Sequence, residues 1–425
     1  MPREELEKQD FNGLGISEGL LKRIKSMGFV HPTPIQFKAI PIATGGEDVV
    51  GIAQTGSGKT LAFSIPMLQH VSETGKIGLV LLPTRELAVQ VEETLRKIAG
   101  GAGIRTAIVI GGTNPRPQIK QLRARPHVIV ATPGRLIDHI EQGHVKLGQV
   151  GILVLDEADR MLDMGFEPQL QKILAGVPEN RQTMLFSATM PDTITKIART
   201  YMKSPLRIEV ARPGTTASKV MQEVILVSKA GKLDVLKRLL NEYKGSVLVF
   251  SRTKHGAKNI ASKIRQMGHT ADEMHSNRSQ NQRQNALKGF STGRYRVLVA
   301  TDIAARGIDV DDLELVVNFD LPEQADDYVH RIGRTGRAGK SGTAISFCAP
   351  DQKGDIVKIQ NLINKKLPVK SPYGDELPVI EGRHPSSKRG RGGYRGGNRG
   401  GSRGGSRGGS RSGGSSRGGR YGRRS

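Results

Sequence analysis

Short, almost continuous apolar runs recur along this chain, and they constrain its fold more than any other feature. The first series consists of DVVGIA, IGLVLL, TAIVI, HVIVA, GILVL and TMLFS. Strands that are apolar on both faces are typical of parallel sheets covered by helices, and helical patterns such as TRELAVQVEETLRKIAG lie between these runs. The alternation predicts βαβ units and therefore a parallel α/β domain.

A second series of such runs follows, namely QEVILVS, GSVLVFS, RVLVATD, LELVVNF and GTAISF. Between the two series lies ARPGTTASK at residues 211–219, a composition typical of a linker. The length of 425 residues also exceeds that of one usual core. We therefore expect two tandem α/β domains with parallel sheets. The predicted segments are 1–36, 37–210, the linker 211–219, 220–367, and an extension at 368–425.

The end of the chain has a different composition. From about residue 383 apolar residues are nearly absent, and a segment with so little to bury is predicted to be disordered. Residues 383–425 contain twelve arginines, Lys388 and no acidic residue, so they carry about half of the net charge of +25. This segment also contains six RGG triplets. The tail could bind a polyanion electrostatically or act only as a solubilising segment, and we favour binding.

The high net positive charge favours a polyanionic partner, most commonly nucleic acid, over the alternative of an anionic membrane surface. The N-terminal MPREELEKQD lacks the apolar stretch of a signal peptide, and no run approaches the roughly 20 residues of a spanning helix. The single cysteine, Cys348, excludes an intramolecular disulfide and a cysteine-based metal cluster, and its run AISFC indicates core packing. We expect a cytoplasmic protein with no membrane partner.

Polar clusters follow the apolar runs of the first series, at the carboxyl ends of the predicted strands. They are AQTGSGKT, PTRELA, ATPGR, DEAD and SAT. Open α/β sheets bind ligands at this edge. One such cluster could be an ordinary loop, whereas five at the same edge predict a site.

The cluster AQTGSGKT, residues 53–60, resembles a phosphate-binding loop between a strand and a helix. Lys59 is placed to reach the β- and γ-phosphates, and Thr60 to ligate Mg²⁺. Ala53 replaces the first glycine of the strict pattern, and a glycine-rich turn is the alternative interpretation. The predicted loop contacts are Ala53, Gln54, Thr55, Gly56, Ser57, Gly58, Lys59 and Thr60.

The acidic cluster DEAD, residues 156–159, supplies the carboxylates that a phosphate-binding loop requires. Asp156 directly follows a predicted buried strand, as does the metal-binding carboxylate of a Walker-B site. Glu157 is then placed to orient or deprotonate the attacking water. Two acids at the start of a helix can also be explained by the helix dipole alone. Beside a phosphate-binding loop, we favour a catalytic pair.

Taken together, these motifs resemble those of the DEAD-box ATP-dependent RNA helicases. DEAD at 156–159 is the family signature, and the family's order is kept by GFVHPTPIQ, AQTGSGKT, PTRELA, GG at 111–112, TPGR, SAT, VLVFSRT, ATDIAARGID and HRIGRTGR. The resemblance covers nearly everything from Phe11 to about residue 350 and implies two RecA-like domains that use ATP and Mg²⁺. The glycine-rich basic tail is most similar to that of the bacterial RhlE-like group.

The resemblance also implies roles in nucleotide binding and hydrolysis. Gln36 would read the adenine edge, while Phe11 and Phe29 would stack on adenine or pack locally. Arg334 and Arg337 match arginine-finger positions, and Gly307 and Asp309 would face the ribose and the opposing domain. The residues implied to couple ATP to RNA are Ser187, Thr189, Asp159, His330 and Arg331, the last two through contacts between the domains.

The same resemblance implies a set of RNA contacts, largely to phosphate and sugar and therefore sequence-independent. They are Arg85, Gly112, Thr132, Gly134, Arg135, Gln280, Arg283, Thr301 and Asp302. Ser276 and Asn277 replace the more usual Gly-Asp of the family, and Arg306 receives no role.

We therefore predict RNA-stimulated ATP hydrolysis coupled to domain closure and to local unwinding of short RNA duplexes. A remodeller or clamp of RNA–protein complexes would share every motif. An RNA-annealing protein with a vestigial phosphate loop is another alternative, disfavoured by the intact Lys59, Glu157, Arg334 and Arg337. A DNA helicase is disfavoured by DEAD together with PTPIQ. Ribosomal and RNA-decay proteins are candidate partners.

Overall fold

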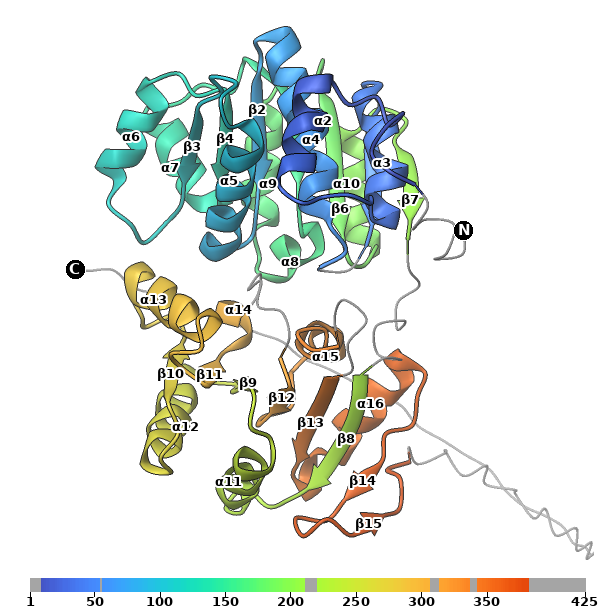
Figure 1. Cartoon of the computed structure of the whole chain (residues 1–425), viewed down its shortest axis with the longest axis vertical. Coiled ribbons are helices and arrows are strands. Elements are labelled where there is room, and N and C mark those ends of the chain that lie inside the picture. Colours follow the sequence, from blue (N-terminus) through green and yellow to red (C-terminus); the bar gives the residue numbers. More distant parts are fainter. Residues whose placement is uncertain (1–8, 54–55, 211–219, 306–312, 337–341, 382–425) are drawn as a thin grey trace, which may run out of the picture. The chain divides into compact units, whose positions relative to one another are not determined.

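The computed structural model describes residues 9–53, 56–210, 220–305, 313–336 and 342–381 (Figure 1). The predicted linker and the predicted disordered tail therefore lie outside the described residues. The same is true of several individual predictions, namely Gln54, Thr55, Arg306, Gly307, Asp309 and Arg337. Among the described helices, none combines the length and the apolar character that a membrane span requires.

The first sheet is parallel and has the strand order β3-β4-β2-β5-β6-β1-β7. Its strands are β1 (Val49–Ile52), β2 (Ile77–Leu81), β3 (Thr106–Val109), β4 (Val128–Ala131), β5 (Val150–Leu155), β6 (Gln182–Ser187) and β7 (Leu206–Glu209). Each predicted run of the first series forms one of these strands. Strand β7 was not predicted, because it lies at the edge of the sheet and three of its four residues are exposed.

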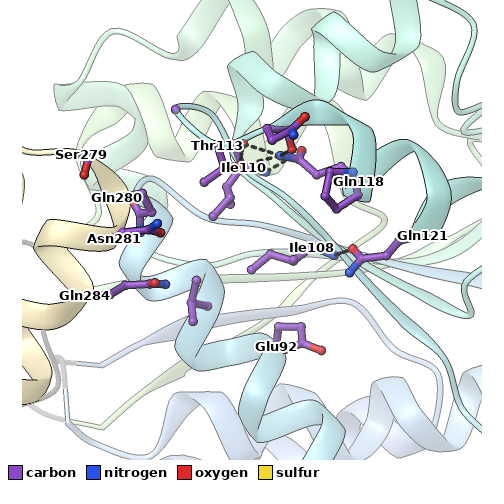
Figure 2. Close-up of a pocket in the computed structure, with 14 residues that line it drawn as sticks. Glu92, Ile108, Ile110, Thr113, Gln118, Gln121, Ser279, Gln280, Asn281 and Gln284 are labelled. Atoms are coloured by element: carbon purple, nitrogen blue, oxygen red, sulfur yellow. Dashed lines mark hydrogen bonds between the residues drawn. The ribbon is translucent and has the colours of Figure 1, made fainter.

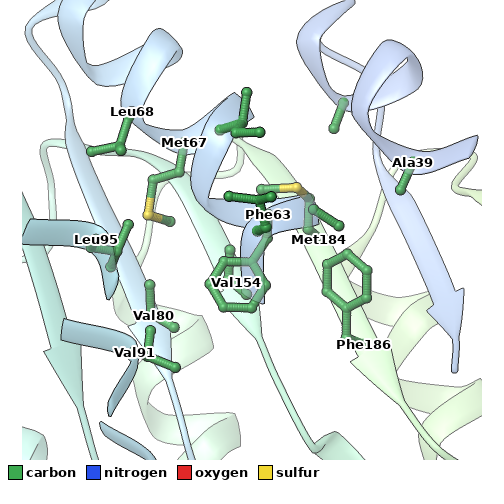
Figure 3. Packing of buried hydrophobic residues seen from close by; sticks show 14 of the residues in the cluster. Ala39, Phe63, Met67, Leu68, Val80, Val91, Leu95, Val154, Met184 and Phe186 are labelled. Atoms are coloured by element: carbon green, nitrogen blue, oxygen red, sulfur yellow. The ribbon is translucent and has the colours of Figure 1, made fainter. Parts of the chain in front are cut away.

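Helices cover both faces of this sheet. They are α2 (Glu18–Ser26), α3 (Pro34–Thr44), α4 (Lys59–Thr74), α5 (Arg85–Ala99), α6 (Pro115–Arg123), α7 (Pro133–Glu141), α8 (Ala158–Asp163), α9 (Glu167–Gly176) and α10 (Asp192–Tyr201). Neighbouring strand residues serve opposite faces: Val49 packs with α3, α4 and α5, and Val50 with α7, α9 and α10. On the first of these faces, Phe63 of α4 lies 5.7 Å from Phe186 of β6 between ring centroids (Figure 3).

The second sheet has the order β10-β11-β9-β12-β13-β8-β14-β15. Its strands are β8 (Val220–Leu226), β9 (Val247–Phe250), β10 (Ala271–Met274), β11 (Val297–Ala300), β12 (Leu315–Asn318), β13 (Gly342–Cys348), β14 (Val369–Lys370) and β15 (Glu376–Leu377). All pairings are parallel except that of β14 with β15. These two strands extend the sheet beyond residue 367, the predicted end of the domain. Cys348 is buried in β13, as its apolar run indicated.

The helices of the second half are α11 (Lys232–Glu242), α12 (Lys254–Gln266), α13 (Gln280–Ser291), α14 (Asp302–Ala305), α15 (Ala325–Ile332) and α16 (Lys353–Ile363), with a 3₁₀ turn at Pro350–Gln352. Helices α11 and α12 pack on one face of the sheet, and α13, α15 and α16 on the other. The predicted fold class, two α/β domains built on parallel sheets, is therefore confirmed. Because the strands within each sheet are parallel, the loops after them meet at one edge, which is where the predicted site lies.

Candidate active site

The loop between β1 and α4 places a helix N-terminus at the carboxyl edge of the first sheet. Gly58 precedes α4 in the left-handed region, with φ 91° and ψ 19°. A Cβ there would lie 2.4 Å from Nε2 of Gln36, so the close packing requires glycine. Lys59 and Thr60 form the first turn of α4, and Ala53, Gly56 and Ser57 complete the described part of the loop. Unsatisfied N–H groups at a helix start favour an anion here.

Lys59 carries a buried charge that lies within ion-pair distance of the Asp156 carboxylate. The residue is 6% exposed, and its Nζ lies 3.9 Å from Oδ1 of Asp156. This ammonium has no hydrogen-bond partner among the described residues. An ammonium offers three donors, and leaving them buried and unused is unfavourable. The phosphate oxygens of a nucleotide would satisfy them, so this residue fits a polyphosphate ligand.

Asp156 directly follows β5 and is almost fully buried. Burial raises the pKa of its carboxyl group to about 6, although the charge of Lys59 acts in the opposite direction. A bound cation would favour the ionised form. Mg²⁺ is commonly held by one or two carboxylates together with substrate phosphates and water. In the described part of the chain no group of three or more His, Cys, Asp or Glu side chains could hold a metal ion.

Glu157 follows in a backbone conformation that is rare for residues other than glycine, with φ 51° and ψ 49°. Its Oε2 accepts a hydrogen bond of 2.7 Å from Nη1 of the buried Arg160. Burial alone would raise the pKa of Glu157, but the charges of Arg160, Lys59 and Arg334 outweigh burial and lower it. The carboxylate is therefore held ionised, as a group that orients or accepts a proton from water must be.

Asp159 connects the acidic cluster to the loop after β6. Its Oδ2 accepts hydrogen bonds from the backbone N–H of Thr189 at 2.9 Å and from the hydroxyl of Thr189 at 3.0 Å. Its own N–H donates to Oγ of Ser187 at 3.2 Å. The structure thus brings together the three residues of the first domain that were predicted to couple ATP to RNA.

Two residues of α15 and the turn after it lie close enough to act on this cluster electrostatically. Arg334 is 2% exposed. Its positive charge, like those of Arg160 and Lys59, lowers the pKa of Glu157 against the effect of burial. Burial lowers the pKa of His330 to about 3, with a further contribution from Arg160. His330 is therefore neutral at physiological pH. The predicted second finger, Arg337, lies outside the described residues, as do Gly307 and Asp309.

Arg331 and Asp302 form an ion pair within the second domain. Nε and Nη2 of Arg331 lie 2.6 and 2.7 Å from the two carboxylate oxygens of Asp302, and the guanidinium stacks over the ring of Phe250. Arg331 also donates to the carbonyl of Asp320 at 2.6 Å. The inter-domain contact predicted for Arg331 and the RNA contact predicted for Asp302 stay predictions. In this structure the buried guanidinium, with so many acceptors, fixes the loop after β11.

The N-terminal segment reaches the phosphate loop through Gln36. Its Oε1 accepts a hydrogen bond from the N–H of Thr33 at 2.9 Å, and its Nε2 donates to the carbonyl of Gly58 at 3.0 Å. Phe11 is 1% exposed and packs in the core of the first domain. Phe29 is 37% exposed.

Four of the predicted RNA contacts of the first domain lie at or just after the start of α5 and α7. Arg85 and Arg135 are partly buried, and Thr132 and Gly134 lie at the start of α7. Nη1 of Arg135 donates to the carbonyl of Thr113 at 3.3 Å. Gly112 has φ 70°, a conformation that residues with a side chain rarely adopt, and a Cβ there would lie 1.8 Å from Nη1 of Arg85 and would displace the guanidinium.

Arg283 of α13 contacts the first domain. Its Nη2 lies 2.7 Å from Oε2 of Glu86 in α5, with side-chain exposures of 10% and 1%. In this structure Arg283 therefore forms an ion pair between the two domains, and its predicted RNA contact stays a prediction. Gln280, one turn earlier, is buried, and Thr301 directly follows β11 with its carbonyl accepting the N–H of Ala305 at 2.8 Å.

Two charged residues of the site were not predicted from the sequence. Arg160 lies three positions after Glu157, a spacing that places both on one helix face and could have suggested the pair. Glu86 lies within the PTRELA cluster, but its partner is 197 residues away. No local pattern indicates that contact.

Comparison with known families assigns both halves of the chain. A DEAD/DEAH box helicase family model matches residues 33–197, and a helicase conserved C-terminal domain model matches residues 231–339.

Curated relatives match most of the chain. The ATP-dependent rRNA helicase RRP3 of Debaryomyces hansenii is 43% identical over 373 residues, which cover 86% of this chain and 78% of the relative. The DEAD-box ATP-dependent RNA helicase CshA of Geobacillus kaustophilus is 44% identical over 377 residues, which cover 88% of this chain and 80% of the relative.

Solved structures share the fold of this chain. S. cerevisiae Dbp5 bound to RNA and ADP BeF3 superposes with a TM-score of 0.76 at 31% identity, covering 85% of this chain and 96% of that one. Mss116p bound to ssRNA and AMP-PNP superposes with a TM-score of 0.78 at 28% identity, covering 86% of this chain and 80% of that one.

Proposed function

The chain belongs to the DEAD-box family of ATP-dependent RNA helicases, and from this premise we propose which of its residues hydrolyse ATP and which bind RNA. The single observation that carries the assignment of the catalytic site is the buried Lys59 ammonium. It lies at the N-terminus of α4, without a hydrogen-bond partner among the described residues, 3.9 Å from the Asp156 carboxylate.

Lys59 and the N–H groups of the phosphate loop bind the β- and γ-phosphates of ATP. Asp156 and Thr60 would hold Mg²⁺, which when bound would offset the negative charge that develops on the phosphoryl oxygens. Gln36, already bonded to the carbonyl of Gly58, is positioned to link recognition of the adenine to the conformation of this loop. Phe29 remains a candidate for stacking on adenine.

Glu157 orients the attacking water and accepts its proton. The hydrogen bond from Arg160 fixes the carboxylate, and the neighbouring positive charges keep it ionised. Arg334 of the second domain stabilises the charge of the transferred phosphoryl group, a contribution that is worth about 10³–10⁵ in rate in related NTPases. Arg337, Gly307 and Asp309 are assigned to the same site by family resemblance alone.

Coupling to RNA follows from the hydrogen bonds of Asp159. This carboxylate holds Thr189 and neighbours Glu157, so a change in the nucleotide alters the position of the SAT loop. His330 of the second domain is neutral and close to Asp159 and Arg160. Its position therefore changes the surroundings of this cluster when the second domain is in place. Hydrolysis is therefore fastest when both domains are together.

Arg85, Arg135 and the loops that carry Gly112, Thr132, Gly134 and Thr301 bind the RNA backbone, and closure of the domains separates short duplexes locally. Gln280 belongs to the same interface. The basic segment 383–425 tethers RNA, and its charge also favours a second candidate function, RNA annealing or clamping with little unwinding.

The finer classification rests on composition. The basic, glycine-rich tail supports membership of a bacterial, RhlE-like group. A cytoplasmic location and partners among ribosomal or RNA-decay proteins fit an RNA helicase with this charge. A pull-down from growing cells, with and without RNase treatment, tests both the partners and their dependence on RNA.

The central test is the steady-state ATPase rate of the full chain with and without RNA. We expect RNA to stimulate the wild type and the Glu157→Gln variant to lose about 100-fold or more of that rate, as for loss of a general base. Glu179→Gln, a change of an exposed acid, serves as the matched control. Absence of stimulation by RNA, or an undiminished rate in Glu157→Gln, would overturn the proposal.

A further inference from the structure

The outer edge of the first sheet carries a one-sided charge distribution. Residues 94–137 contain eight lysines and arginines and no acidic residue, although the whole chain has 40 acidic residues. Figure 1 shows α6 and β3 at one side of this domain, and β3 is an edge strand of its sheet. Five of the cations are exposed on α6 or beside it, and we call them the α6 surface: Arg105, Arg116, Lys120, Arg123 and Arg125.

Glutamine side chains fix the orientation of α6 on the sheet. Gln118, buried on the inner side of the helix, accepts the N–H of Ile110 at 3.2 Å and donates to the hydroxyl of Thr113 at 2.7 Å (Figure 2). Gln121 accepts the N–H of Ile108 in β3 at 3.1 Å. These bonds hold one side of α6 against the edge of the sheet, so the opposite side faces solvent.

The cations of α6 form a row on that outer side. Arg116, Lys120 and Arg123 are spaced as i, i+4 and i+7, which places them on one face of the helix. At 1.5 Å per residue the row is about 10 Å long. Because α6 connects the carboxyl end of β3 to the amino end of β4, the row leads away from the carboxyl edge, where the predicted RNA contacts lie.

Arg105 and Arg125 continue the row beyond the helix. Nη2 of Arg105 donates to the carbonyl of Arg125 at 2.9 Å, and its Nε donates to that of Ala124 at 3.3 Å. Both arginines are exposed. The loop before β4 therefore adds two positive charges where α6 ends.

The charges of the α6 surface have no counter-charge within the described part of the protein. None of its five residues forms an ion pair there, and two acids that flank the stretch, Glu92 and Asp138, pair with Arg96 and Arg135 instead. Like charges one helical turn apart repel each other. Contact with the phosphates of a nucleic acid replaces this repulsion by attraction and releases counterions.

The composition of the stretch decides between the forms of RNA. Residues 94–137 contain no Phe, Tyr or Trp. Proteins that bind single strands stack bases on aromatic side chains, whereas double-stranded RNA is held through its phosphates and 2′-hydroxyls. We propose that the α6 surface binds the phosphate backbone of a double-stranded RNA segment that continues from the strand bound at the carboxyl edge.

This inference rests on the proposed function, because it requires an RNA strand at the carboxyl edge. It adds a second RNA-binding surface outside the predicted contacts and assigns a duplex to it. The two surfaces together favour RNAs in which a single strand adjoins a duplex.

The test compares three RNAs that share one single-stranded segment: one without a duplex, and two with a hairpin at the 5′ or the 3′ end. Their affinities for the full chain are measured by fluorescence anisotropy with AMP-PNP and Mg²⁺ at several salt concentrations. We expect the wild type to bind one of the hairpin RNAs about tenfold more tightly than the bare strand at low salt. The triple variant Arg116→Gln, Lys120→Gln, Arg123→Gln should lose this preference. For the preferred hairpin RNA alone, the slope of log affinity against log salt concentration should fall by about 2–3.

A control variant removes the same charge from the other side of the domain. The triple change Lys196→Gln, Arg199→Gln, Lys203→Gln alters exposed positions on and just after α10, which leads to β7 at the opposite edge of the sheet. This variant should keep the hairpin preference, and thermal unfolding checks that both variants are folded.

The proposal is overturned if the wild type shows no hairpin preference, if the α6 variant keeps it, or if the control variant loses it equally. An equal loss of affinity for all three RNAs in the α6 variant also overturns it. Binding of polyglutamate by the wild type but not by the α6 variant, without a hairpin preference, would identify an acidic polypeptide as the partner and overturn the assignment to RNA. Stimulation of ATPase by the bare strand without a hairpin preference refutes the α6 surface alone, whereas no stimulation by any RNA refutes the proposed function.

Discussion

The ion pair between Arg283 and Glu86 gives a sharp test of how the two domains are held together. The two side chains meet at 2.7 Å and are 10% and 1% exposed. With an effective dielectric constant of about 20, two unit charges at this distance attract by about 6 kcal/mol, before desolvation is subtracted. Removing one partner of a buried pair typically costs about 3–5 kcal/mol, because the other charge stays buried and uncompensated.

We therefore expect Arg283→Met to disfavour the state in which the domains touch by about 3 kcal/mol, a factor of about 100. The readout is kcat/KM for ATP at saturating RNA, with domain closure followed by fluorescence energy transfer between labels on the two domains. Glu86→Gln should produce a similar loss. The double variant should be no worse than either single variant, because both charges of the pair are then absent.

A direct RNA contact by Arg283 predicts a different pattern. In that case Arg283→Met weakens RNA binding, Glu86→Gln does not, and the effects of the two changes add. Lys288→Met, which removes an exposed charge from the same helix, is the matched control and should change little. Additive losses, or a Glu86→Gln variant with wild-type closure, would refute the reasoning.

Three further predictions follow from individual residues. In the protein without nucleotide and Mg²⁺, Asp156→Asn should raise the free energy of unfolding at pH 7.5 by up to about 3 kcal/mol. The pKa of Asp156 is about 6 in the folded protein and 3.8 in the unfolded chain, so the free energy of unfolding of the wild type falls as the pH rises from 4 to 6. Thermal unfolding should show the difference vanishing below pH 4. Gly112→Ala places a Cβ against Arg85 at φ 70°, so RNA affinity should fall about tenfold in titrations, and an unchanged affinity would contradict this geometry. Deletion of 383–425 should weaken RNA binding and flatten its dependence on salt while ATP hydrolysis persists at saturating RNA, as binding and ATPase assays can check.

The strands and the catalytic loops were predictable because both depend on local sequence. Apolar runs marked the buried strands, but β7, β10, β14 and β15 were missed. Strand β7 is mostly exposed, β10, with the sequence ADEM, is half polar, and β14 and β15 have only two residues each. Lys59 and Asp156 come together because each follows a parallel strand of the same sheet. Parallel topology alone places such residues at one edge.

The partners of the charged side chains could not be predicted in the same way. Arg283, Arg331 and Asp302 matched positions that the family resemblance assigned to RNA or to the opposite domain, and the structure pairs them with carboxylates or guanidinium groups of the protein. Which acceptor a guanidinium finds depends on tertiary packing across tens or hundreds of residues. A motif specifies where an arginine lies along the chain and leaves its partner open.

The charges around Glu157 explain why hydrolysis depends on both domains. The first domain contributes the buried carboxylates Asp156, Glu157 and Asp159, but only Lys59 and Arg160 as neighbouring cations. Arg334 of the second domain adds a third positive charge that lowers the pKa of Glu157 against the effect of burial. ATP brings further negative charge to this site, so the need for Arg334 rises when the nucleotide is bound. We therefore expect the first domain alone to hydrolyse ATP slowly, because it lacks this third cation, and we expect RNA that holds the domains together to bring Arg334 to the site.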